Sequence, residues 1–245
     1  MKLLSLSVVI FSIAFLNSTQ IYAQSAPSNN ASKTDNLRNA FHGSVIRTSK
    51  KEIKTEGSPY FMDNWSKGNI LYKEKNLVEN VEIKYHTYHD QIIVKQNGQE
   101  LMLAAKDVKE FSILTTEGEK LFQNQLVTNE DDKFNHNSYL ELHFQGTHLT
   151  LGTHWRTYII KAPRDNTYHS VDANKKDQFA LTSDLYLVYN QEAVKFSKKR
   201  FLKLFPEHKV ALNKYIKLQQ LDLKSLAGIK QLSMYCDQIL STTAQ

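Results

Sequence analysis

The chain has 245 residues, of which 41% are hydrophobic, and it carries 31 Lys and Arg against 25 Asp and Glu. This composition excludes a disordered polar chain, and eight Gly and four Pro exclude a repetitive fibrous protein. The single cysteine, Cys236, excludes an internal disulfide, so stability must come from a packed core.

The chain begins with a pattern typical of a secretory signal peptide, residues 1–23. Lys2 supplies the positive start, residues 3–16 are almost continuously apolar, and Ala23 completes a small-residue cleavage site. The apolar run is short for a membrane span, although an uncleaved anchor is the alternative. Gln24 follows the site, where a lipoprotein would need Cys. We expect an exported protein, periplasmic, outer-membrane-associated or secreted, with no transmembrane segment in the mature chain.

Residues 24–54 are rich in Ser, Asn, Lys and Thr, which predicts a flexible leader that ends in a short strand. A β-rich region, residues 55–190, follows. Residues 81–85 alternate strictly between apolar and charged, which indicates a half-buried strand. Asn97-Gly98 between two β-rich runs predicts a hairpin. The first five predicted strands are joined by short links, which favour an antiparallel meander: residues 68–72, 78–85, 92–95, 100–103 and 108–114.

A second hairpin is predicted from residues 138–144 and 147–151, with a two-residue turn at Gln145-Gly146. This register places Leu142 opposite Leu149 and Leu140 opposite Leu151, so that the leucines share one face. Further strands are predicted at residues 120–127, 155–161 and 184–189, and a long polar loop at 163–178.

The same register places His143 opposite His148, with Glu141 on their face. Two imidazoles and a carboxylate can hold a zinc or copper ion, so these three residues are metal-site candidates. His154 lies six residues beyond His148, about 20 Å along a straight strand, too far to join the same ion. The alternative is a polar, solvent-facing row that is rich in histidine.

No catalytic residue and no cofactor-binding residue can be assigned. The sequence lacks a His-Glu-x-x-His zinc motif, a Gly-rich phosphate loop and a nucleophile elbow. His86 and His89 sit where a strand is expected to end, and we interpret them as part of an ordinary polar turn.

The periodicity changes after residue 190, and three helices are predicted. Ser197 can cap a first helix that ends before Pro206, and Pro206 suits the first turn of a second helix. The second helix would use Val210, among others, as an apolar position. Asp222 can cap a third helix with apolar residues at three- to four-residue spacing.

The basic charge is concentrated in this helical region. Residues 24–190 contain 20 Lys and Arg and 21 Asp and Glu, whereas residues 191–245 contain 10 and 4. Four cations of the first helix, Lys198, Lys199, Arg200 and Lys203, can contact an anionic surface. Because export is expected, nucleic acid is not an expected partner. The alternative is the solvated face of short amphipathic helices.

Several segments resemble a group of uncharacterised exported proteins from Bacteroidota, over most of residues 57–240. The segments are Gly57-Ser58-Pro59-Tyr60, Trp65, Gly68, residues 81–85 and the tail from Phe196 to Pro206. The resemblance implies a bacterial envelope location and a β-rich body with a helical tail. It implies no activity, since the group has none that can be carried over.

The fold predicted from these features is mainly β, an antiparallel meander that is curved or barrel-like, with a C-terminal helical segment, α+β overall. The expected organisation is a signal peptide at 1–23, a leader at 24–54, a β domain at 55–190 and a helical basic segment at 191–245. We expect a non-enzymatic binding or interaction protein of the envelope. The alternatives are a hydrolase-like enzyme with a dispersed site in a β-barrel pocket and a carrier of a small apolar ligand.

Overall fold

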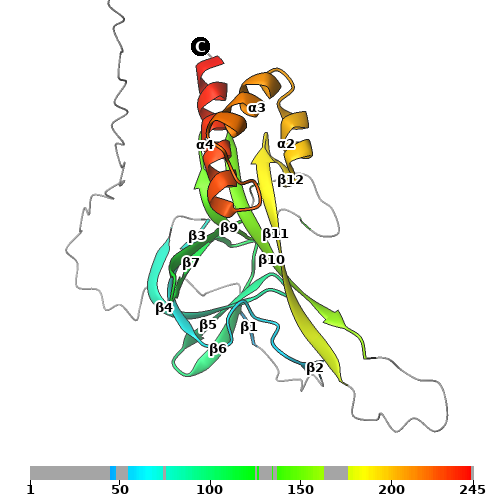
Figure 1. Ribbon diagram of the computed structural model, residues 1–245. Helices are drawn as coiled ribbons and strands as arrows, with labels where there is room; N and C mark the ends of the chain where they lie inside the picture. The colour runs from blue at the N-terminus through cyan, green and yellow to red at the C-terminus, as the bar shows by residue number, and fades with distance from the viewer. Residues whose placement is uncertain are drawn as a thin grey trace, which may run out of the picture. The chain divides into compact units, whose positions relative to one another are not determined.

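The computed structural model describes residues 45–47, 55–73, 76–124, 126, 134, 137–162 and 176–243 (Figure 1). All of them belong to one unit, residues 33–245. The predicted signal peptide, residues 1–23, lies outside the described residues. So does the predicted leader, apart from the short strand at 45–47, and so does most of the polar loop after residue 162.

Twelve strands and three helices make up the described fold. The strands are β1 Val45–Arg47, β2 Thr55–Glu56, β3 Ser66–Tyr72, β4 Leu77–His86, β5 Gln91–Gln96, β6 Gln99–Leu103, β7 Val108–Thr115, β8 Gly118–Gln123, β9 Leu140–Gln145, β10 Leu149–Ile160, β11 Asp177–Tyr189 and β12 Glu192–Lys195. The helices are α2 Lys198–Leu204, α3 Lys209–Leu218 and α4 Leu226–Thr243. The chain is therefore mainly β with a C-terminal helical segment, as predicted.

The strands form one sheet in the order β1-β6-β5-β4-β3-β7-β8-β9-β10-β11-β12, and β2 pairs with β11. The pairings are antiparallel, except for the parallel contact of β2 with β11. The Asn97-Gly98 hairpin is confirmed, because Gln96 pairs with Gln99 and both turn residues have positive φ, 50° and 76°.

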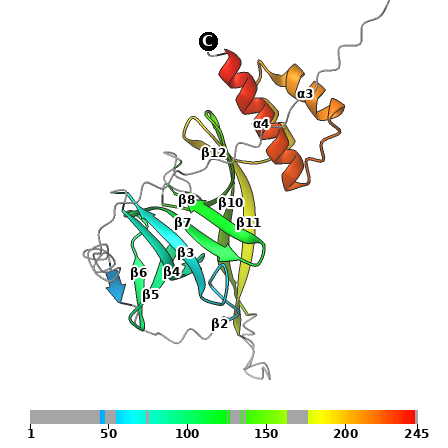
Figure 2. The ribbon, with the colours of Figure 1, turned by 90° about the vertical axis from the view of Figure 1, so that its left-hand side faces the viewer.

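The predicted five-strand meander is wrong in its last step. β7 pairs with β3, on the far side from β5 and β6, as Figure 2 also shows. A glycine permits this placement, since a Cβ on Gly68 would lie 1.9 Å from the Ser112 carbonyl oxygen of β7. The predicted strand at 120–127 is also misplaced, because β8 begins at Gly118 and ends at Gln123.

Aromatic side chains fill the first of two main cores. Tyr85, Phe111, Phe122 and Tyr139 are almost completely buried, and the parallel rings of Phe111 and Phe122 lie 4.7 Å apart. Trp155 joins this core from β10 through an edge contact of 5.1 Å with Phe61. These aromatic side chains pack against one another and against the aliphatic residues of the same cluster.

The second core joins the three helices to β9, β10 and β11. Leu149, Leu151 and Leu187 of the sheet lie in one buried cluster with helical side chains such as Phe201 and Leu232. Cys236 is buried in the same cluster, where burial and the neighbouring Asp237 raise the pKa of its thiol to about 12. The thiol is therefore a packing group at neutral pH.

The helix boundaries confirm one predicted cap and correct two expectations. The Ser197 side chain accepts a hydrogen bond from the Arg200 amide at 3.2 Å, as predicted for the start of α2. Pro206 lies in a turn before α3, which begins only at Lys209. Ser225 caps α4 by accepting from the Gly228 amide, whereas Asp222 accepts from Lys224 in the preceding turn.

The β region extends past the predicted boundary at residue 190. Tyr189 pairs with Glu192 across a two-residue turn, and the second strand of this hairpin is β12. Asn190 and Gln191 both have positive φ, 49° and 62°, as this turn requires. Neither residue is glycine, so the turn lacks the sequence signal that marked residues 97–98.

Candidate functional site

The hairpin that carries the metal-site candidates has a different register from the predicted one. Leu151 pairs with Phe144 and Gly152 with Leu142, so His143 is the extra residue of a β-bulge. His148 lies in the loop before β10 and does not face His143. The predicted pairs Leu142–Leu149 and Leu140–Leu151 are wrong for the same reason.

A carboxylate from α4 determines the shape of this loop. Asp237 accepts hydrogen bonds from the backbone amides of Thr147, His148 and Leu149 at 3.0, 2.7 and 2.9 Å. A Cβ on Gly146 would lie 2.4 Å from the Asp237 carboxyl group, so only glycine fits there. The loop is therefore three residues long and folds around a helix residue that is remote in sequence.

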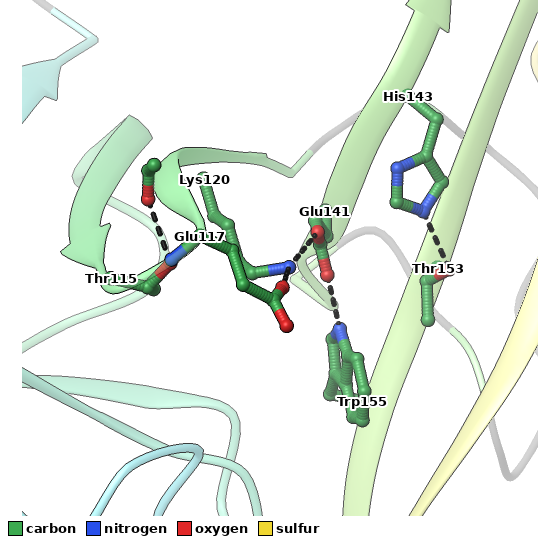
Figure 3. A network of polar contacts seen from close by, with 8 residues as sticks. Thr115, Glu117, Lys120, Glu141, His143, Thr153 and Trp155 are labelled. Atoms are coloured by element: carbon green, nitrogen blue, oxygen red, sulfur yellow. Dashed lines mark hydrogen bonds and ion pairs between the residues drawn. The ribbon is translucent and has the colours of Figure 1, made fainter.

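Glu141 is buried in a network of its own, shown in Figure 3. Its carboxylate accepts from the Trp155 indole N–H at 2.6 Å and from Lys120 Nζ at 3.0 Å. Burial lowers the pKa of Lys120, but its contacts with Glu141 and Glu117 outweigh burial and raise it overall. Both oxygens of Glu141 are thus occupied by donors.

His143 lies beside this network and contacts a different partner. Its Nε2 is 2.7 Å from the Thr153 hydroxyl. Burial lowers the pKa of His143, Glu141 raises it, and Lys120 and Lys230 lower it further. Because His143 and His148 are not cross-strand neighbours, the register no longer supports a metal site made of Glu141, His143 and His148. Among the described residues there is no cluster of three or more His, Cys, Asp or Glu suited to a metal ion.

The turn between β4 and β5 is more buried than the predicted polar turn. His86 is 8% exposed, stacks on His89 at 4.8 Å between ring centres and meets the Tyr60 ring edge-on at 5.0 Å. Burial, followed by the nearby His89, lowers the pKa of His86 to about 4. His86 is thus a neutral core residue at physiological pH.

Asp90 in this turn contacts two aromatic residues that are far apart in the sequence, Tyr85 and His154. The sequence does not predict this arrangement. Its carboxylate accepts from the Tyr85 hydroxyl and lies 3.3 Å from Nε2 of His154 on β10. Asp90 and His154 are 64 positions apart, so no local pattern could have paired them. Thr87 and Thr157 tie the same two segments together through their hydroxyls, which are 2.7 Å apart.

The predicted basic cluster lies on the outside of the helical region. Lys198, Lys199, Arg200 and Lys203 are exposed on α2, while Phe201 and Leu202 face the second core. Within the described part of the chain, none of these four cations forms an ion pair with a carboxylate. Lys195, which precedes them, pairs with Asp184 at 2.5 Å.

α3 continues this surface and adds apolar side chains to it. Lys209, Lys214 and Lys217 are exposed, whereas Leu212 and Ile216 are buried. Val210, predicted as an apolar position of the helix, is 81% exposed, and Leu218 is 67% exposed. We call the seven exposed cations of α2 and α3, with Val210 and Leu218, the basic helical face.

Comparison of the chain with protein-family models, with curated proteins and with solved structures finds no match. The resemblance to exported proteins of Bacteroidota therefore stays a prediction. Among the described helices, none combines the length and the apolar character needed to cross a membrane.

Proposed function

We propose that this chain is an exported, non-enzymatic binding protein that attaches peripherally to an anionic phospholipid surface through the basic helical face. The proposal rests on one observation: α2 and α3 expose seven cations without ion pairs among the described residues, and α3 also exposes two apolar side chains, Val210 and Leu218.

The charges of the basic helical face suit an anionic surface. Each Lys or Arg close to an anionic leaflet contributes about 1 kcal/mol, so several weak contacts can add up to useful affinity. Asp and Glu neighbours would cancel this attraction, but Glu207 is the only acidic residue between positions 195 and 217. The face therefore presents nearly uncompensated positive charge.

The apolar residues favour a lipid surface over other polyanions. Val210 and Leu218 lie on the same side of α3 as Lys214, since offsets of four and eight residues return to one helix face. An interfacial helix inserts such side chains among the acyl chains while its lysines contact headgroups. An acidic polysaccharide or a nucleic acid would give these two side chains nothing comparable to contact.

The sheet offers less support for the enzyme alternative. The Glu141 carboxylate is occupied by Lys120 and Trp155, and His154, 5% exposed, is buried against Asp90, whose carboxylate also accepts from the Tyr85 hydroxyl. A catalytic base needs access to a substrate proton, and neither group has it in this conformation.

Vesicle co-sedimentation tests the proposal. The chain should bind vesicles of phosphatidylglycerol and phosphatidylcholine at 50 mM salt, release them at 500 mM, and ignore pure phosphatidylcholine, because the attraction is screened by salt. Replacing Lys198, Lys199, Arg200 and Lys203 by Glu should abolish binding. The matched control replaces four exposed lysines of the sheet region by Glu, namely Lys67, Lys73, Lys106 and Lys109. Equal loss in the two variants, or binding that survives high salt, would overturn the proposal.

A second pair of variants tests the apolar contribution. Val210→Ser with Leu218→Ser should weaken vesicle binding by about thirtyfold, since partial burial of each side chain contributes about 1 kcal/mol. Leu77→Ser with Leu114→Ser is the control, because these residues are 57% and 54% exposed on the sheet. If only charge matters, both double variants will bind as the wild type does, and a polyanion without a lipid phase becomes the better ligand.

A further inference from the structure

The outer edge of β11 is paired only at its two ends. β10 pairs with the inner edge over residues 178–189. On the outer edge, β2 pairs at Asp177 and Gln178, and β12 pairs from Tyr186 to Tyr189. Figure 1 shows β2 and β12 at opposite ends of β11. In the part of the chain that the structure describes, no strand pairs with the outer edge between them.

The backbone groups along this gap can be identified from the pairing pattern. The Phe196 amide donates to the Leu185 carbonyl at 2.7 Å, next to the last pair with β12. Because antiparallel strands alternate the direction of their backbone groups, odd-numbered residues of β11 face the outer edge. Leu181 and Ser183 therefore present their N–H and C=O groups outward.

Contacts of Phe179 and Leu185 with other parts of the chain determine the length of the gap. At one end, a Cβ on Gly57 would be 3.2 Å from the Phe179 carbonyl oxygen, so the chain after β2 lies against that residue. At the other end, Leu185 already bonds to Phe196. Among the described residues, the edge without a strand partner is therefore 180–184, about 17 Å of strand.

This edge lacks the features that usually protect an exposed strand. Residues 180–184 read Ala-Leu-Thr-Ser-Asp, with no Pro, Gly or Lys. The one charged residue, Asp184, is neutralised by Lys195 at 2.5 Å. Leu181 and Tyr158, on opposite faces of the β10–β11 pair, are 42% and 47% exposed.

We propose that the gap between β2 and β12 is a binding slot for an extended peptide segment of a partner protein, which adds as a strand of about five residues to β11. The segment would be uncharged, with apolar side chains at alternate positions. On one face its side chains would contact Leu181. On the other face they would reach Tyr158, because Ala180, the cross-strand neighbour of Tyr158, is small.

A second copy of the chain does not fit this slot through its own β11. Antiparallel pairing of two β11 strands along their outer edges would place the second copy's strand where β2 lies. A free, extended segment meets no such obstacle because it can end before β2 and before β12. The slot is separate from the basic helical face, and this inference does not depend on the proposed membrane attachment.

Fluorescence polarisation with a labelled probe tests the slot in the full chain. The probe is the hexapeptide Thr-Val-Thr-Val-Thr-Val, and a copy with N-methyl groups on residues 2–6 keeps the side chains but removes the amide donors from both strand edges. The wild type should bind the first peptide and lose at least about tenfold in affinity for the second, since strand addition depends on backbone hydrogen bonds. Equal binding of both peptides, or no binding of either at 1 mM, would overturn the proposal.

Two substitutions at one position separate the backbone from the side chain. Leu181→Pro removes an outward N–H and is tolerable on an edge, and it should weaken binding by about tenfold. Leu181→Thr keeps the N–H and should bind within about threefold of the wild type. If both variants bind alike, the proposed backbone pairing is wrong.

Amide hydrogen exchange gives a readout that needs no substitution. In the free wild type, the Leu181 and Ser183 amides should exchange much faster than those of Ala180 and Thr182, which face β10. The probe peptide should slow exchange at Leu181 and Ser183.

If Leu181→Pro fails to fold, Ser183→Lys replaces it in the binding assay, because this substitution places a charge on the edge. If the peptide binds but exchange at the Leu181 and Ser183 amides does not change, the peptide binds at another site and the proposal is wrong.

Discussion

At the scale of single residues, Glu141 shows how a buried acid can be a structural group and not a free ligand. Its side chain is 7% exposed and neutralised by Lys120, while the Trp155 indole occupies its other oxygen. Removing the carboxylate would leave a partly buried ammonium group and a partly buried indole N–H without their partner. Such losses destabilise folded proteins more than the net contribution of the ion pair itself.

We predict that Glu141→Ala lowers the free energy of unfolding by about 3 kcal/mol, because both donors lose their partner. Urea unfolding followed by tryptophan fluorescence measures the change. Glu117→Ala is the control, since Glu117 also contacts Lys120 but its side chain is 78% exposed, and its cost should stay below about 0.5 kcal/mol. Similar losses in the two variants would contradict the structural role of Glu141.

His86 predicts a specific dependence of stability on pH. Its pKa is about 4 in the folded chain, against an ordinary value of 6.5. Between these values the unfolded chain binds a proton that the folded chain excludes, so stability is complete above pH 6.5 and falls as pH decreases towards 4. The full effect, reached below pH 4, is on the order of 3 kcal/mol.

Urea midpoints at pH 7.5 and pH 4.5 test this dependence. His86→Phe should lose less stability between the two pH values than the wild type, because the proton-excluding ring is gone. His89→Asn should reduce the slope less than His86→Phe does, because burial of His86, the larger cause of its lowered pKa, remains. Carboxylates titrate over the same pH range in all three proteins. The contribution of His86 is therefore measured as the difference between the proteins in how far the urea midpoint shifts from pH 7.5 to pH 4.5. An unchanged slope in His86→Phe would remove His86 as the cause.

At the scale of elements, Asp237 is the strongest polar link between α4 and the sheet. One buried carboxylate accepts from three consecutive amides, those of Thr147 and His148 in the loop between β9 and β10 and that of Leu149 at the start of β10. We predict that Asp237→Ala costs about 3 kcal/mol of stability and speeds amide exchange at residues 147–149. Asp222→Ala, which loses one exposed turn hydrogen bond, should cost about 1 kcal/mol or less and leave those amides protected. Protection that survives in Asp237→Ala would show that the loop keeps its shape without α4.

The elements that the sequence predicts are those whose signal is local. Alternation in residues 81–85, the Asn97-Gly98 turn and the Ser197 cap each specify their structure within a few residues. The register of β9 and β10 could not be predicted in this way, because Asp237 determines it from 89 positions away. The place of β7 beside β3 likewise depends on a close approach at Gly68.

In the candidate site, too, the features with a local sequence signal could be predicted, whereas those that depend on distant contacts could not. Composition alone locates the cations of α2, because charged side chains remain in water wherever the helix packs. The exposure of Val210 could not be predicted, since an apolar residue at helical spacing is usually buried. The Asp90–His154 contact and the gap along β11 arise from pairing between distant segments, which leaves no pattern in the sequence.

At the scale of the whole molecule, the predicted boundary at residue 190 neither ends the sheet nor separates two cores. β12 follows the boundary and remains part of the sheet. Leu149, Leu151 and Leu187 pack against side chains of α2, α3 and α4, and among the described residues the buried hydrophobic side chains of these helices lie in this one cluster. Sheet and helices should therefore depend on one another for stability.

This dependence predicts a single cooperative unfolding transition. The only two tryptophans, Trp65 and Trp155, belong to the sheet region, so fluorescence reports on the sheet, while circular dichroism at 222 nm reports mainly on the helices. The urea midpoints from the two signals should coincide in the wild type, because unfolding the helices exposes the second core of the sheet. Asp237→Ala should lower both midpoints together. A helical signal that disappears at lower urea than the fluorescence change would mean that α2–α4 form a separate unit, and the shared core would then contribute little to the stability of the sheet.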